Sequence, residues 1–158
     1  MHIRVATSVD AQRISRLLRS LSHTFTLSPT GEGAEAFFAT ITEPAIAALI
    51  KRDDIVYLVA ETVPDGKLAG AAAMRDNRVL CHLFVDPAYQ GAGLGRRLWE
   101  CLRDRALRAG NPGTFIVNSS INAVPVYEKF GFVVASARVE KHGGAYVPMV
   151  LEPTTPLR

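Results

Sequence analysis

The sequence has few cysteines for its 158 residues, and the two it has do not form a metal or disulfide pattern. Cys81 and Cys101 both lie inside apolar segments, without the close spacing of zinc ligands. Small folds held together by disulfides usually carry more cysteines in a shorter chain. The sequence therefore indicates a protein of a reducing compartment, and we expect no bound metal.

Long hydrophobic runs are also absent. Residues 1–5 lack the roughly 7–15 apolar residues of a secretory signal, and no run approaches the roughly 20 apolar residues of a membrane span. We therefore expect a cytoplasmic protein that does not associate with membranes. The net charge of +3 is small, and no basic stripe is interleaved with aromatic residues, so nucleic-acid binding is not favoured.

The overall composition is typical of a water-soluble protein with a well-formed core. Hydrophobic residues make up 48% of the chain and charged residues 21%. The length is close to that of one average domain, and no linker, repeat or low-complexity segment divides it. We therefore expect a single domain over residues 1–158.

Hydrophobic periodicity and turn residues predict an alternation of helices and short strands. A hydroxyl followed three residues later by an acid, from Thr7 to Asp10, predicts the start of the first helix. The predicted strands 55–60, 68–74 and 79–85 follow one another closely in the sequence, so we expect these three central strands to form an antiparallel meander. The predicted strands are 3–6, 55–60, 68–74, 79–85, 114–117, 132–139 and 145–151. The further helices are 34–39, 43–51, 94–110 and a short one from Asn122 to Gly131.

A glycine-rich turn separates the strand 79–85 from the helix that follows it. Its residues are Gln90, Gly91, Ala92, Gly93, Leu94 and Gly95. A helix N-terminus presents unpaired backbone N–H groups and the positive end of the helix dipole, and glycines let an anion approach closely. A plain tight connection would also explain the turn. A dinucleotide motif would need glycine where Arg96 stands, and no Gly-Lys-Ser/Thr of a P-loop is present.

Two segments together resemble the GCN5-related N-acetyltransferase (GNAT) superfamily. Residues 83–98 are similar to its acetyl-CoA motif, Gln/Arg-x-x-Gly-x-Gly/Ala after a strand. Residues 123–132, Ala-Val-Pro-Val-Tyr-Glu-Lys-Phe-Gly-Phe, resemble a second family segment. The resemblance implies the GNAT fold: an α/β (α+β) domain with a mixed, mostly antiparallel sheet of six to seven strands and about four flanking helices. It also implies an enzyme that moves an acetyl group from acetyl-CoA to a primary amine, by direct attack in a ternary complex.

The same resemblance implies which residues contact coenzyme A. Tyr127 is implied to be the general acid that protonates the departing thiolate, although a packed aromatic on a short helix has the same pattern. Asn118 and Asn122 lie where the family's cofactor arm passes, and Asn122 also suits a helix cap. The implied cofactor-binding residues are Phe84, Val85, Gln90, Gly91, Ala92, Gly93, Leu94, Gly95, Arg96, Asn118, Asn122 and Tyr127.

The general base is not evident from the sequence. Relatives often place Glu or His at positions matching Val79 and Cys81, and neither residue here can act as a base. His82 is the candidate, but strand alternation directs it to the opposite face unless a bulge re-aims it. Deprotonation through water is the alternative. Cys81 has no histidine spaced to activate it as a nucleophile, so direct transfer is favoured.

The family resemblance places the acceptor between residues 22–40 and 140–146. Phe25, Phe37, Phe38, Glu32 and Glu35 are candidates for binding an amine, although core packing and solvation explain them equally. A small-molecule amine is favoured over a protein acceptor, and a homodimer through the last strands is open. A non-catalytic acyl-CoA sensor on the same fold is the alternative function, because the third central strand lacks a carboxylate.

Overall fold

The computed structural model describes residues 1–24, 26–28 and 30–153, and its elements follow the predicted order closely. The α-helices are α1 (Ala11–Ser20), α2 (Glu35–Phe38), α3 (Glu43–Lys51), α4 (Leu94–Arg108) and α5 (Val124–Lys129). The strands are β1 (His2–Val5), β2 (Ile55–Glu61), β3 (Leu68–Arg75), β4 (Val79–Val85), β5 (Phe115–Ser119), β6 (Val133–Val134), β7 (Val139–Lys141) and β8 (Gly144–Leu151). Short 3₁₀ turns are η1 (Ser8–Asp10), η2 (Ser22–Thr24), η3 (Ala39–Ile41), η4 (Pro87–Tyr89) and η5 (Ile121–Ala123).

The strands of the described residues form one mixed, mostly antiparallel sheet. Its order is β1-β2-β3-β4-β5-β8-β6, with β7 paired to β8. The neighbours are antiparallel except for β4 and β5, which are parallel. The expected fold class and the antiparallel meander β2-β3-β4 are therefore confirmed, with eight strands among the described residues in place of six to seven.

The extra strand arises because the predicted strand 132–139 is interrupted. Val133 and Val134 pair with the end of β8, and pairing resumes only at β7. Pro148, near the middle of β8, accepts a hydrogen bond from the Ala135 N–H through its carbonyl, at 2.8 Å. It has no N–H to donate in return, so the ladder is not continued toward β7. The prediction of one continuous strand was wrong for this reason.

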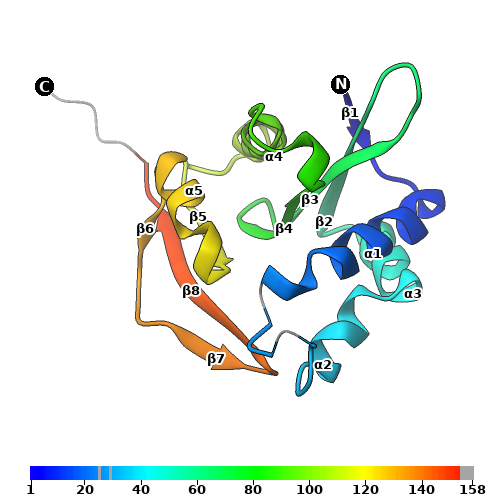
Figure 1. The fold of residues 1–158 in the computed structure, drawn as a ribbon. Coiled ribbons are helices and arrows are strands. Elements are labelled where there is room, and N and C mark those ends of the chain that lie inside the picture. Colours follow the sequence, from blue (N-terminus) through cyan, green and yellow to red (C-terminus); the bar gives the residue numbers. More distant parts are fainter. Residues whose placement is uncertain (25, 29, 154–158) are drawn as a thin grey trace, which may run out of the picture.

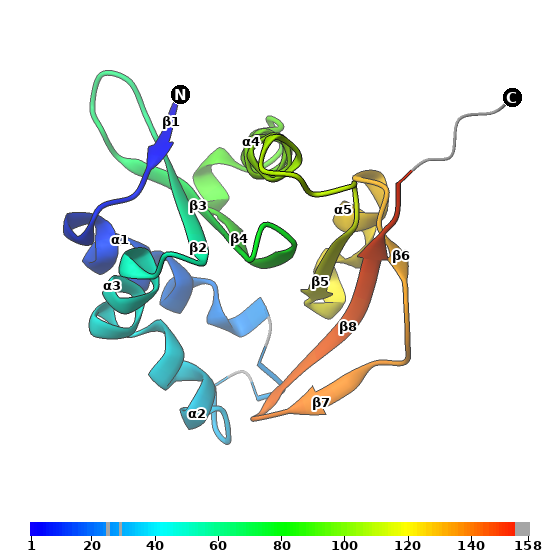
Figure 2. The same cartoon turned by 180° about the vertical axis from the view of Figure 1, so that it is seen from behind.

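The two halves of the sheet separate at the parallel pair. β4 and β5 share only two residue pairs in the described chain, Val79 with Ile116 and Leu80 with Val117. β4 then continues to Val85 and β5 to Ser119 without pairing to each other. Figures 1 and 2 show β1–β4 and β5–β8 diverging from this point. The sheet is thus splayed where the predicted cofactor segment begins.

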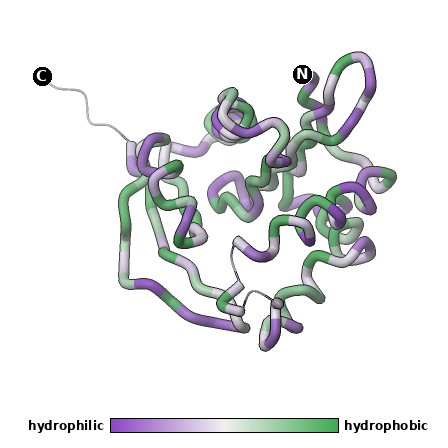
Figure 3. Tube along the Cα trace, in the orientation of Figure 1, coloured by the Kyte–Doolittle hydropathy of each residue, from purple (hydrophilic) through white to green (hydrophobic). Residues whose placement is uncertain are grey.

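Helices cover both faces of the first half of the sheet. One hydrophobic cluster joins α4, through Leu98, Trp99 and Leu102, to the sheet and to Tyr127 of α5. The other joins α1 and α3, through Ile14, Leu18 and Ile46, to the opposite face. In Figure 3 the central strands are coloured mostly as hydrophobic, in keeping with this arrangement. No helix of the described residues is long and apolar enough to cross a membrane.

The predicted start of the first helix is confirmed, and it anchors the N-terminal strand. The Asp10 carboxylate accepts a hydrogen bond from the Thr7 N–H at 2.8 Å, and from Arg4 and Arg13 at 2.7–2.9 Å. Both arginines also bind Glu61 at the end of β2. Burial alone would raise the pKa of Asp10, but the hydrogen bonds from Arg4, Thr7 and Arg13 outweigh it and hold the pKa well below its usual value.

Candidate active site

The glycine-rich turn presents a row of unpaired backbone N–H groups. In the described part of the chain, no hydrogen bond uses the N–H groups of residues 91–96, and the first bond of α4 is Arg97 N–H to the Gly93 carbonyl, at 3.0 Å. Gly91 and Gly93 adopt φ values of +85° and +81°, in the left-handed region. A Cβ added at either glycine would meet no atom within 4 Å. The turn therefore combines free donors, the positive helix end and open space, which together suit an anion.

Side chains on both sides fix the position of this turn. Asp86 accepts a hydrogen bond from the Ala88 N–H at 2.9 Å, and the Gln90 Nε2 donates to the Val85 carbonyl at 2.9 Å. The Arg96 guanidinium lies 5.0 Å from the centre of the Phe130 ring. It also donates to the Lys129 carbonyl at 3.2 Å. The Gln90 and Arg96 side chains thus hold the turn, and the backbone N–H groups are what it offers to a ligand.

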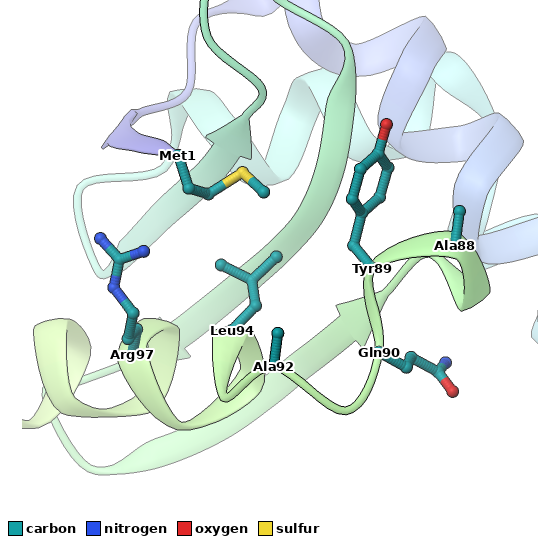
Figure 4. A pocket seen from close by; sticks show the side chains of 7 residues that line it. All are labelled: Met1, Ala88, Tyr89, Gln90, Ala92, Leu94 and Arg97. Atoms are coloured by element: carbon teal, nitrogen blue, oxygen red, sulfur yellow. The ribbon is translucent and has the colours of Figure 1, made fainter.

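A hollow of about 240 Å³ adjoins the turn on the side of the N-terminus. Figure 4 shows Met1, Leu94 and Arg97 around it, with Tyr89 beside it and the Gln90 side chain turned away. A second hollow, of about 310 Å³, lies farther along α4 beside β1 and contains none of the predicted site residues. Of the two, only the first borders the predicted phosphate-binding segment.

Tyr127 is packed by its ring and open at its hydroxyl. Its ring meets Phe130 and Phe132 edge-on, at centroid distances of 5.9 and 5.8 Å, and the residue is 7% exposed. In the described residues, every side-chain nitrogen or oxygen that is fully enclosed has a hydrogen-bond partner. The Tyr127 hydroxyl has no partner there, so it is not fully enclosed and reaches accessible space. Burial raises the pKa of this phenol well above its usual value. Tyr127 is therefore protonated at neutral pH, and its raised pKa makes it a weaker acid than a free phenol.

A β-bulge lies at the point where β4 leaves β5. Ala73 of β3 pairs with His82 and Met74 pairs with Leu80, so Cys81 has no partner on β3. A bulge shifts the alternation of side chains by one residue. Leu80 therefore packs in the α4-side cluster, whereas His82 lies on the α1 and α3 side.

The bulge meets the condition under which His82 was expected to be re-aimed. Side chains alternate along β4 before the bulge, so the Val79 side chain points to the face opposite to that of Leu80. This is the same face on which His82 lies. There the His82 ring makes edge contacts with Tyr57 and Phe84, at 5.7 and 5.6 Å between centroids. Burial lowers the pKa of His82 to about 4, so the ring is neutral at neutral pH.

Sequence reasoning missed the partner of this histidine. The Tyr57 hydroxyl lies 2.7 Å from the His82 Nδ1, although the residues are 25 positions apart. In the sequence Tyr57 is one aromatic residue of a strongly hydrophobic strand, which gives no signal of a polar role. The pairing depends on the β2-β3-β4 order and on the bulge in β4, and a single sequence does not specify the bulge.

The two asparagines near α5 are both exposed, and neither caps the helix. Asn118 lies on β5, past its last pair with β4. Asn122 lies inside η5, and Ala123 precedes α5 without a side-chain cap. The predicted Asn122 cap was therefore wrong, because the 3₁₀ turn moves the helix start beyond it. Pro125 is in the first turn of α5, as predicted.

The two segments expected to flank the acceptor touch each other directly. Thr26 forms an antiparallel bridge with Gly144, and the Leu27 N–H donates to the Gly143 carbonyl at 2.7 Å. Gly143 lies so close to Gly33 that a Cβ there would meet the Gly33 carbonyl carbon at 2.5 Å. Phe37 and Phe38 meet edge-on, and Glu35 accepts from the Gly33 N–H at 3.3 Å. Phe25 lies outside the described residues.

Metal ligands do not gather among the residues that the structure describes. The described residues contain no group of three or more His, Cys, Asp or Glu placed to hold a metal ion. Cys81 is exposed at the bulge, and its Sγ contacts the Val79 carbonyl at 3.5 Å. The polar groups described at the site include the backbone N–H groups of the turn, the Tyr127 phenol and the His82 imidazole.

Comparison with known proteins assigns the chain to a family. Residues 25–153 match the model of the acetyltransferase (GNAT) domain, and the chain belongs to this family. It resembles the PaiA N-acetyltransferase of Thermoplasma acidophilum, whose structure contains coenzyme A, with a TM-score of 0.76 and 18% identity. That match covers 97% of this chain and 100% of the other. The GNAT fold expected from the two sequence motifs is confirmed.

Two curated relatives act on different kinds of acceptor, as their names state. The chain is 34% identical over 99 residues to the glucosamine 6-phosphate N-acetyltransferase of Trypanosoma brucei brucei, a match that covers 55% of this chain and 65% of the relative. It is 34% identical over 87 residues to the ribosomal protein bS18-alanine N-acetyltransferase of Escherichia coli K12, covering 52% and 59%. The matches thus span less than two thirds of either relative.

Proposed function

We propose that residues 1–158 form one N-acetyltransferase domain, which transfers the acetyl group of acetyl-CoA to a primary amine by direct attack in a ternary complex. The observation that carries the proposal is the row of unpaired N–H groups at residues 91–96, placed beside the splayed end of β4. The pyrophosphate binds these donors, and Phe84 and Val85 present backbone groups along the pantetheine arm. Asn118 and Asn122 flank that arm from the other half of the sheet.

The transfer itself requires one proton to leave the amine and one to reach the thiolate. Removing the proton of an alkylammonium of pKa about 10.4 at pH 7 costs about 5 kcal/mol of free energy. Its proton passes to water, and the amine nitrogen attacks the thioester carbonyl. The C–N bond forms, the C–S bond breaks, and the thiolate takes the proton of Tyr127. The second amine proton returns to the tyrosinate through solvent, so the products are the amide, coenzyme A and one released proton.

A small-molecule acceptor is supported by the contacts of Thr26, Leu27 and Gly33 with the turn at Gly143 and Gly144. Two backbone segments that touch leave less room than an extended polypeptide needs at that end. The glucosamine 6-phosphate relative is consistent with this choice. The ribosomal-protein relative makes a peptide amine the alternative acceptor.

The test is release of coenzyme A thiol from acetyl-CoA with a panel of amines. The panel contains amino sugars and their phosphates, polyamines, aminoglycosides and short peptides with N-terminal alanine. We expect release with a small amine and a product heavier by one acetyl group. Binding of coenzyme A without release for any amine would contradict the proposal and support the acyl-CoA sensor.

Replacement of Tyr127 by Phe tests the proton donor. With the amine found above, we expect the turnover to fall by about 10²–10⁴-fold, the usual contribution of a general acid. The affinity for coenzyme A measured by calorimetry should stay the same, because the ring packing on Phe130 and Phe132 is kept. Unchanged turnover would refute the role of Tyr127 and leave the acyl transfer itself in place.

A further inference from the structure

Tyr57 and His82 form a polar pair on the face of β4 that lies under α1 and α3. Tyr57 is 2% exposed, and its hydroxyl lies 2.7 Å from the His82 Nδ1. The pair connects β2 to β4 across β3. The two rings meet edge-on at 72°, and Phe84 packs on the His82 ring at 62°. The ring orientation of His82 is thus fixed by its neighbours.

The hydrogen-bond count of the pair decides which imidazole nitrogen carries the proton. Within the residues that the structure describes, the Tyr57 hydroxyl has no hydrogen-bond partner except Nδ1 of His82. If Nδ1 were protonated and donated to the phenol oxygen, the buried phenol O–H would have no acceptor, at a cost of about 1–3 kcal/mol. If the phenol donates to an unprotonated Nδ1, both groups are satisfied. A neutral imidazole then carries its proton on Nε2.

We propose that Tyr57 holds His82 in the neutral tautomer protonated at Nε2, so that His82 serves acyl transfer as a hydrogen-bond donor and not as the general base. This inference rests on the proposed function for its catalytic part only. In this tautomer Nε2 has no lone pair with which to accept the amine proton. The low pKa of His82 acts in the same direction, because a weak base gains little from the proton of an alkylammonium.

In this proposal, the Nε2–H of His82 donates a hydrogen bond to an oxygen atom of one of the two substrates. Tyr57 occupies Nδ1, and His82 is only half-buried. In the described residues no fully enclosed side-chain nitrogen or oxygen lacks a partner, and Nε2 has no partner there, so Nε2 reaches accessible space and is the ring atom left for substrate. A carbonyl, hydroxyl or phosphate oxygen of the acceptor would be bound before the reaction, whereas the thioester oxygen becomes a strong acceptor only as negative charge develops on it. Loss of a bond to the acceptor raises KM, and loss of a bond to the thioester oxygen lowers kcat. Tyr57 is a positioning residue in both cases.

Replacing His82 by Gln separates the donor from the base. The Gln side chain can place an N–H near the position of Nε2 but cannot act as a base, and Ala does neither. We expect His82→Ala to lower kcat/KM by about 10- to 100-fold, which corresponds to the loss of one such hydrogen bond. We expect His82→Gln to keep most of the kcat/KM of the unaltered protein. Equal loss in both variants, by about 10²–10⁴-fold, would overturn the donor role in favour of the base.

Replacing Tyr57 by Phe tests the positioning, with Ile55→Val as the matched control. Ile55 is buried in the same hydrophobic cluster and on the same strand, but it takes part in no side-chain hydrogen bond. We expect Tyr57→Phe to lower kcat/KM by several-fold or more, and Ile55→Val to leave it unchanged. Equal activity of the two variants would overturn the positioning role.

The tautomer is measured directly by ¹⁵N NMR of the imidazole in the whole protein without substrate. We expect Nδ1 of His82 to resonate as an unprotonated nitrogen and Nε2 as a protonated one at pH 7 to 8. In Tyr57→Phe the two tautomers should mix. A proton on Nδ1 in the unaltered protein would overturn the inference. Because this measurement needs no acceptor, it holds even if no amine proves to be a substrate.

Discussion

Replacement of Gly93 by Ala should weaken coenzyme A binding in addition to lowering the stability of the fold. Gly93 has φ +81° and an open side, so the added methyl group clashes with no protein atom. The left-handed conformation costs an alanine about 1–2 kcal/mol in both the free and the bound protein. The methyl group instead occupies space beside the free N–H groups. Losing one charge-assisted hydrogen bond to a phosphate costs about 1.5–3 kcal/mol, so the Kd should rise by about 10- to 150-fold.

Gly66 provides the matched control for this substitution. It lies in the loop between β2 and β3, with φ +70° and no atom within 4 Å of an added Cβ. Gly66→Ala should therefore lose a similar free energy of unfolding, measured by chemical denaturation, and bind coenzyme A normally in calorimetry. If Gly93→Ala and Gly66→Ala bound coenzyme A equally well, the assignment of the pyrophosphate to this turn would be refuted.

Two further substitutions have defined outcomes. Asp10→Asn should lower the free energy of unfolding by about 2 kcal/mol, below the roughly 3–5 of a fully buried pair, because Arg4 and Arg13 stay about one third exposed. The folded pKa of Asp10 lies below its unfolded value near 3.9, so its stabilisation is present above that pH and is lost as the pH falls. The free energy of unfolding of the Asn variant in urea should therefore depend less on pH in the acid range. The same acid dependence in both proteins would contradict this. Arg96→Ala should lower stability by about 1 kcal/mol, through loss of the contact with Phe130, and reduce coenzyme A affinity only slightly; a large loss of affinity would show that the guanidinium leaves Phe130 to bind phosphate.

The parts of the fold that could be predicted are those in which local pattern and tertiary packing agree. The helix of residues 94–108 has Leu94, Leu98 and Leu102 on one face, and all three are buried in the α4-side core. The turn at residues 90–95 was identifiable because positive φ leaves glycine as the natural choice. The interruption of the predicted strand 132–139 could not be foreseen, since it depends on Pro148 in a different strand.

The predicted site divides in the same way. The glycine-rich turn and Tyr127 belong to contiguous motifs. In the structure the turn has unpaired N–H groups and the phenol is accessible, and the roles of both stay predictions. His82 could be named only as a conditional candidate, because the face it occupies depends on a bulge at Cys81. Tyr57 was not identified at all. Its role comes from a hydrogen bond to a residue two strands away, which leaves no trace in the pattern of β2.

Amide hydrogen exchange of residues 91–96, with and without coenzyme A, tests the central claim most directly. These N–H groups have no protein partner in the described chain, so they should exchange quickly in the free protein. On binding coenzyme A, several of them should slow by tenfold or more, while the equally strained Gly66 keeps its rate. Saturation with coenzyme A that leaves the exchange of residues 91–96 unchanged would contradict the account.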